Sequence, residues 1–118
     1  MTEQNVLIQK KQYSKEVGEH IGLELGTKLI KNHHDATGDT SAHFVGKDIV
    51  LNLLNQPNCV GINIFKAIDE SGKNTYVLVG MDNAGKAIIE YPVITPDGEL
   101  SKQEGIVADR MKIDFWNE

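Results

Sequence analysis

Residues 58–91 decide the fold that we expect: Asn58 is followed by CVGINIFKAID (59–69), ESGKN (70–74), TYVLVGMD (75–82), NAGK (83–86) and AIIEY (87–91). The first, third and last of these segments are dense in β-branched and apolar residues, which is typical of short strands. The same D-x-x-G-K turn connects them twice, thirteen positions apart, at 69–73 and 82–86. Its Asp can bond the turn backbone and its Gly supplies a positive φ, as in a type I turn with a G1 bulge. The stretch therefore predicts antiparallel strands in a meander.

The second of these strands is expected to lie in the centre of the sheet, because TYVLVGM is apolar on both faces. A third turn is predicted at 96–99 (PDGE). Residues 41–45 (SAHFV) are interpreted as a short strand or an extended lead-in, and residues 105–111 (GIVADRM) as a further strand.

Two helices are predicted on the N-terminal side of this sheet. Over residues 12–33 the apolar positions recur every four residues, at Tyr13, Val17, Ile21, Leu25 and Leu29. Ser14 is the expected N-cap, and Gly38 suits the left-handed residue that ends such a helix. Residues 48–55 predict a second, shorter helix that Pro57 ends. The expected fold is thus α+β: an antiparallel β-meander of three to five strands with two N-terminal helices packed on one face.

Three glycines in the first predicted helix, Gly18, Gly22 and Gly26, are also spaced by four. Each costs up to ~1 kcal/mol of helix propensity relative to Ala, so a line of three favours close packing against the sheet or a second copy. The alternative is that they face solvent and merely weaken the helix. The pair Phe115–Trp116 either pins the tail onto the body or marks a partner surface. These five residues are the predicted interface of a homo-oligomer.

Length and composition limit the classes of protein. The 118 residues predict a single domain over 1–118, of which 1–9 are expected to be poorly ordered. The net charge of −5 and the aromatic share of 6% argue against a nucleic-acid partner. The single cysteine, Cys59, excludes an intramolecular disulfide and a cysteine metal cage. With no signal peptide and no long apolar run, we expect a cytoplasmic protein that does not enter the membrane.

Chemistry-bearing residues are sparse. His33, His34 and Asp35, with Asp39 or His43, are the metal candidates, but adjacent helical histidines point about 100° apart, and a polar helix end is the favoured interpretation. Nucleophile-elbow, phosphate-loop and calcium-loop patterns are all missing, so no cofactor is predicted. We therefore expect a non-catalytic binding or interaction domain, and a homodimer. The alternative is a small enzyme or ligand carrier with a pocket between helices and sheet, for which the candidates are His20, His43, Asn63 and Tyr76.

The stretch QPNCVGI (56–62), followed by GKNTYVLVG (72–80), resembles a group of small uncharacterised bacterial proteins. The resemblance covers about the middle third of the chain. Members of the group carry cysteines toward the C-terminus, and this chain has none there. No activity is known for the group, so the resemblance assigns no residue a role.

Overall fold

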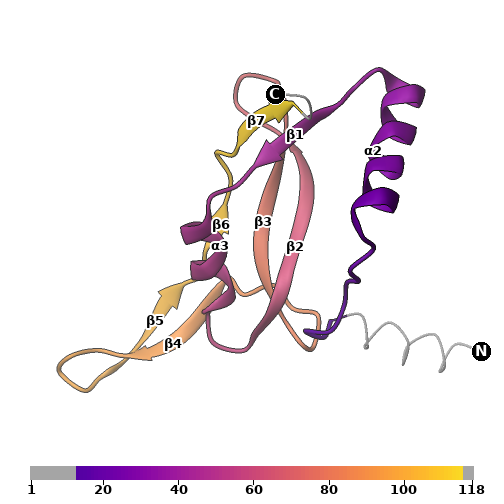
Figure 1. Ribbon diagram of the computed structural model, residues 1–118. Coiled ribbons are helices and arrows are strands. Elements are labelled where there is room, and N and C mark those ends of the chain that lie inside the picture. Colours follow the sequence, from indigo (N-terminus) through magenta and orange to yellow (C-terminus); the bar gives the residue numbers. More distant parts are fainter. Residues whose placement is uncertain (1–12, 116–118) are drawn as a thin grey trace, which may run out of the picture.

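The chain is α+β in the computed structural model, which describes residues 13–115 (Figure 1). Its elements follow in the order α2 (Leu23–Thr37), β1 (Ser41–Phe44), α3 (Lys47–Leu54), β2 (Cys59–Ile68), β3 (Asn74–Asp82), β4 (Glu90–Ile94), β5 (Leu100–Glu104), β6 (Val107–Ala108) and β7 (Lys112–Phe115). Every strand pairing among the described residues is antiparallel, as the hairpin turns predict. Residues 1–9, whose order was in question, and Trp116 lie outside the described residues.

The strands are divided among three sheets, so a single meander does not describe them. The largest has the order β2-β3-β6, and β3 lies in its centre as predicted. The hairpin β4–β5 and the pair β1–β7 form separate two-stranded sheets. The third expected strand, residues 87–91, begins later than predicted. It makes one bridge to β3 through Ala87, and then leaves that sheet to form β4.

The two D-x-x-G-K turns form as predicted and share one hydrogen-bond pattern. In each, the Asp amide donates to the Lys carbonyl, at 2.8 Å for Asp69 and 3.0 Å for Asp82. The turn glycines Gly72 and Gly85 have φ of 86° and 81°, which L side chains rarely adopt. A third copy of the pattern starts at Thr95, thirteen positions after Asp82, and connects β4 to β5. The regular spacing thus extends to a turn that lacks the leading Asp.

The first helix begins eleven residues later than predicted, and the prediction of a helix over residues 12–33 was wrong in this part. Gly18 and Gly22 have φ of 115° and 86°, which lie outside the helical region. Gly22 is the N-cap of α2, and Ser14 only closes a turn with Val17. The C-terminal end agrees with the prediction, because Gly38 is left-handed and its amide donates to the His34 carbonyl. The positive φ of these two glycines keeps the residues before Leu23 out of the helix that the period-four apolar pattern predicted.

The core lies where α3 packs on one face of β2 and β3. Its buried cluster consists of Leu53, Leu78 and Ala108. Half-buried hydrophobic side chains of α3, β2, β3 and the segments next to β1 and β6 surround it. Gln56, directly after α3, is the buried polar residue of this region. Its side chain donates to the Leu53 carbonyl at 3.1 Å and accepts from the Ile106 amide at 2.8 Å. It therefore ties the end of α3 to the segment that leads into β6.

The two helices do not share one face of the sheet, contrary to the prediction. Figure 1 shows α3 against the main sheet and α2 as a separate arm beside β2, joined to the body by residues on either side. None of residues 23–37 is buried. Because α3 lies between β1 and β2 in the chain, it cannot extend α2 as a second N-terminal helix. This leaves α2 without a packing surface among residues 13–115.

Candidate functional site

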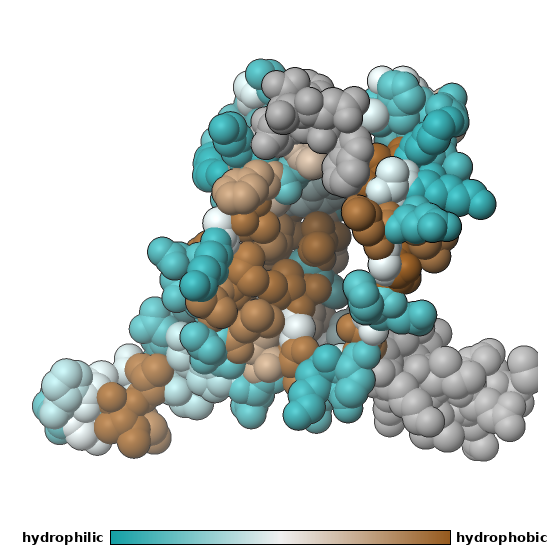
Figure 2. Space-filling model, in the orientation of Figure 1, coloured by the Kyte–Doolittle hydropathy of each residue, from teal (hydrophilic) through white to brown (hydrophobic). Residues whose placement is uncertain are grey.

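Apolar side chains are exposed over three parts of the molecule. Figure 2 shows them on the side of α2 nearest the sheet, around α3 in the middle of the body, and on the β4–β5 hairpin. The exposed large hydrophobic residues include Ile21, Leu25, Leu29, Leu51, Leu54, Ile64, Phe65, Ile68, Ile94 and Leu100. Contiguous exposed apolar patches mark interaction sites in natural proteins, whereas single exposed hydrophobic residues are ordinary.

The apolar stripe of α2 is one such surface. Leu25 and Leu29, one turn apart, are 44% and 49% exposed, and Ile30 beside them is half-buried. An isolated helix of this length is marginal in water, because most helix stability in proteins comes from packing an apolar face. Lys31 and Asp35 form an ion pair of 2.9 Å on the exposed side of the helix, which adds only a few tenths of a kcal/mol. The stripe of α2 is therefore an apolar surface that residues 13–115 leave exposed.

The second half of β2 is a further exposed surface. Ile64 and Ile68 are 64% and 71% exposed, and Phe65 on the opposite face is 49% exposed. Among the strands that the structure describes, β2 pairs with β3 alone. One edge of the main sheet is thus an apolar strand with an open side.

A polar cleft of about 520 Å³ lies between the C-terminal end of α2, β1 and the first hairpin turn. Its lining residues are His33, Asp39, Ser41, His43, Gly72, Lys73, Asn74 and Tyr76. Two of these, His43 and Tyr76, were predicted as pocket residues. Their rings meet edge to face, with centroids 4.8 Å apart and an interplanar angle of 86°. The Nε2 atom of His43 lies 3.4 Å from the Asn74 carbonyl oxygen.

The other side of this cleft carries an acid beside a histidine. Asp39 Oδ1 accepts the Ser41 amide at 2.9 Å, and Asp39 Oδ2 lies 3.7 Å from His33 Nε2. The Ser41 hydrogen bond, helped by His33, holds the pKa of Asp39 below its usual value. Asp39 is therefore a carboxylate at neutral pH, and it lines a cleft of ligand size together with Lys73 and two imidazoles. Sequence reasoning singled out these residues separately, but it could not bring a helix end and a hairpin turn together.

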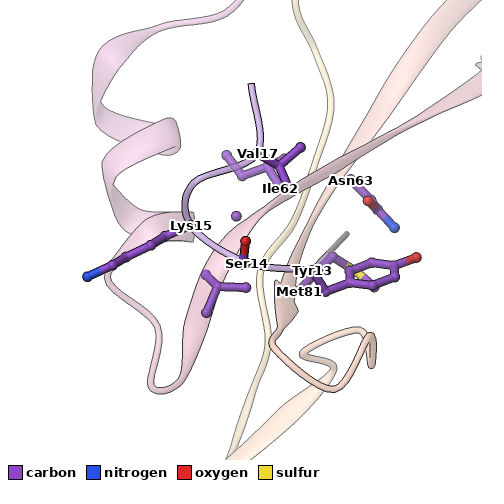
Figure 3. Close-up of a pocket in the computed structure, with 9 residues that line it drawn as sticks. Tyr13, Ser14, Lys15, Val17, Ile62, Asn63 and Met81 are labelled. Carbon is purple, nitrogen blue, oxygen red and sulfur yellow. The ribbon is translucent and has the colours of Figure 1, made fainter. Parts of the chain in front are cut away.

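Asn63 lies in a different cavity, of about 270 Å³, between the segment before α2 and the start of β2. Figure 3 shows Tyr13 close to Met81 in this cavity, and Lys15 extending away from the other side chains. The ring of Tyr13 also lies against Gly85, where a Cβ would come within 3.2 Å of it. His20, the last pocket candidate, is exposed in the segment before α2. The four predicted pocket residues therefore do not form one site.

The metal candidates are not brought together. His33 faces Asp39, whereas Asp35 bonds Lys31, so the side chains of His33 and Asp35 are engaged with different partners. Within residues 13–115, no group of three or more His, Cys, Asp or Glu side chains is arranged to hold a metal ion. None of the described helices is long and apolar enough to cross a lipid bilayer.

The predicted interface residues lie in different parts of the structure. Gly18 and Gly22 lie before α2 and have positive φ, so the three glycines do not form a line on one helix. Gly26 is inside α2, and a Cβ built on it would meet nothing within 4 Å among the described residues. Phe115 is the last residue of β7, with its backbone opposite Ser41. Trp116 lies outside the described residues.

Comparison of the chain with protein families, with curated proteins and with solved structures found no match. The case for a function therefore depends on the surfaces and the cleft described above.

Proposed function

We propose that the protein is a non-catalytic interaction domain that works as a homodimer. The observation that carries the proposal is the apolar stripe of α2: Leu25 and Leu29 are half exposed on a fifteen-residue helix of which no residue, from 23 to 37, is buried. A helix of this kind gains its stability by packing, and since residues 13–115 do not bury its stripe, we propose that a second copy of the chain does.

Gly26 supports the same proposal. A glycine inside a helix costs about 1 kcal/mol relative to Ala, and the space beside Gly26 is open among the described residues. Because glycine has no side chain, a helix or sheet of a second molecule could approach the backbone closely at Gly26. Of the three glycines predicted at the interface, Gly26 is the one whose backbone conformation does not already require glycine.

The test compares Leu29→Glu with Thr27→Glu by light scattering over a range of protein concentrations. Both substitutions add one negative charge to an exposed position of α2, but only Leu29 belongs to the apolar stripe. Burying the exposed half of the Leu29 side chain stabilises the dimer by about 1 kcal/mol, and a symmetric dimer buries two such side chains. Losing both contacts costs about 2 kcal/mol of binding free energy, or roughly thirtyfold in dissociation constant.

We expect Leu29→Glu to weaken the dimer by at least this factor and Thr27→Glu to leave it unchanged. Equal dissociation constants for the two variants would show that the stripe of α2 is not the contact. Circular dichroism of both variants as monomers checks that each remains folded.

A second candidate function is a small-ligand site at the cleft beside His43 and Tyr76. The observation that favours it is the convergence of Lys73, His33 and His43 on a cleft of about 520 Å³, within the range of natural ligand sites. Inorganic phosphate is a suitable first probe because Lys73 is positively charged and imidazole N–H groups can donate hydrogen bonds to an anion. NMR shift changes confined to the cleft, and lost in Lys73→Ala, would support it. Shifts spread over the exposed lysines of the chain would count against it.

A further inference from the structure

The outer side of β2 carries amide and carbonyl groups that pair with no strand within residues 13–115, and the first hairpin turn identifies them. The Asp69 amide donates to the Lys73 carbonyl, so this pair sits at a hydrogen-bonded position of the β2–β3 ladder. In an antiparallel ladder, hydrogen-bonded and non-hydrogen-bonded pairs alternate. Counting back through the register, the pairs Ile68–Asn74, Lys66–Tyr76, Ile64–Leu78 and Ile62–Gly80 are non-hydrogen-bonded.

An independent hydrogen bond agrees with this assignment. Gly80, which the count places at a non-hydrogen-bonded position with β2, accepts the Ile88 amide at 2.9 Å on the opposite side of β3. The same alternation on β2 directs the amide and carbonyl groups of Ile62, Ile64, Lys66 and Ile68 away from β3. These four residues form the outer edge of β2, which pairs with no other strand that the structure describes.

This edge has few of the features with which natural proteins protect a free strand. Charged side chains, lysine above all, are among the usual devices, together with proline, short length and bulges. The bulge of β2 lies at its start, between Cys59 and Gly61, and residues 62–68 are in regular register with β3. Lys66 is the single charged residue in this stretch. A regular, apolar edge of this length is a template for another strand.

We propose that two copies of the chain pair through this edge, with β2 antiparallel to β2 of the second copy and the two-fold axis at Phe65. The inference rests on the proposed homodimer and names its contact. Centring on Phe65 pairs Ile64 with Lys66 of the second copy, and Ile62 with Ile68, so that all four outward-facing residues of each strand are used. The two copies then form one continuous sheet through main-chain hydrogen bonds.

Side chains favour this register over its neighbours. A two-fold axis at Lys66 would set two lysines directly opposite each other, which is destabilising. An axis at Phe65 instead brings the two half-exposed phenylalanine rings together at a non-hydrogen-bonded position, where cross-strand aromatic pairs stabilise a sheet.

Disulfide cross-linking of single-cysteine variants tests the register. In a Cys59→Ser background, Phe65→Cys places two thiols on opposite strands with Cα atoms about 4.5 Å apart, which suits a disulfide. Ala67→Cys, on the same face of β2, is the matched control. Because residue 67 lies two positions from the axis on each strand, the two thiols of an Ala67→Cys dimer would be about 13 Å apart.

We expect mild oxidation to convert Phe65→Cys to a covalent dimer at least tenfold faster than Ala67→Cys. Mixing Asn63→Cys with Ala67→Cys should give the crossed heterodimer, because positions 63 and 67 lie opposite each other in this register. Lys66→Pro, which removes an outward amide, should weaken the dimer at least tenfold relative to Lys66→Ala.

The outcomes separate this inference from the proposed function. A wild-type dimer in which Phe65→Cys cross-links no faster than Ala67→Cys overturns pairing through β2 and leaves the homodimer standing. A wild type that stays monomeric up to millimolar concentration overturns both. If Lys66→Pro unfolds the monomer, the cross-linking rates still decide the question.

Discussion

Replacing Gln56 by Met should destabilise the fold by about 2–4 kcal/mol. Gln56 is 5% exposed and connects the end of α3 to the segment before β6 through two side-chain hydrogen bonds, of 3.1 Å to the Leu53 carbonyl and 2.8 Å from the Ile106 amide. Each such bond contributes about 0.5–1.5 kcal/mol, and a buried group left without a partner costs a further 1–3 kcal/mol. In the variant the Leu53 carbonyl still accepts a hydrogen bond from the backbone amide of residue 56, at 3.4 Å. We therefore expect the unpaired Ile106 amide to account for most of the loss of stability.

Urea unfolding followed by circular dichroism measures this loss, at one fixed protein concentration because an oligomer makes stability depend on concentration. Asn55→Ala is the control, since Asn55 precedes Gln56 but is exposed, and we expect its effect to stay within about 0.5 kcal/mol. A loss below about 0.5 kcal/mol for Gln56→Met would refute the claim that this side chain joins the two parts of the core.

Three further predictions follow from close approaches and charges. A Cβ on Gly80 would lie 2.6 Å from Gln56 Nε2, so Gly80→Ala should destabilise the wild type more than it destabilises a Gln56→Ala variant. A double-mutant cycle by urea unfolding measures this difference, and additive effects of the two substitutions would contradict the prediction. A Cβ on Gly105 would lie 2.0 Å from a backbone oxygen, so Gly105→Ala should cost more than the ~1 kcal/mol typical of point mutations; a Tm equal to wild type would contradict this. Arg110 donates two hydrogen bonds to Glu70, which lower the pKa of Glu70 to about 2 from its ordinary 4.5. The depressed pKa means that the pair stabilises the fold above pH 4.5 and that this contribution is lost as the pH falls toward 2. Thermal melts of Glu70→Gln should therefore differ from wild type at neutral pH and converge with it in acid, with a small difference that salt reduces, because both side chains are about three-quarters exposed.

Local signals in the sequence predicted the local parts of the fold. The D-x-x-G-K turns, the left-handed Gly38, the helix after Gly46 and the central position of β3 each depend on a few neighbouring residues, and each is confirmed. The start of α2 was wrong because periodicity cannot show that a glycine will take a positive φ. The third turn was predicted, but the sequence did not show that it has the same hydrogen-bond pattern as the other two. Its first residue is Thr95, whose hydroxyl accepts the hydrogen bond that the Asp carboxylate accepts in the other turns.

Features that depend on distant residues could not be predicted. Pairing of β1 with β7, and the salt bridge between Glu70 and Arg110, join segments that are far apart in the chain. The polar cleft likewise needs the end of α2, β1 and a hairpin turn to meet. The role of Gln56 was missed because a glutamine after a helix is usually exposed. Its place between Pro57 and a helix end gives no signal of burial.

We propose that a second copy of the chain covers the apolar surfaces of α2 and β2. Light scattering of the wild type from micromolar to millimolar concentration tests it most directly. We expect a mass of twice 13.1 kDa that falls toward 13.1 kDa on dilution. A mass of 13.1 kDa at every concentration would contradict it.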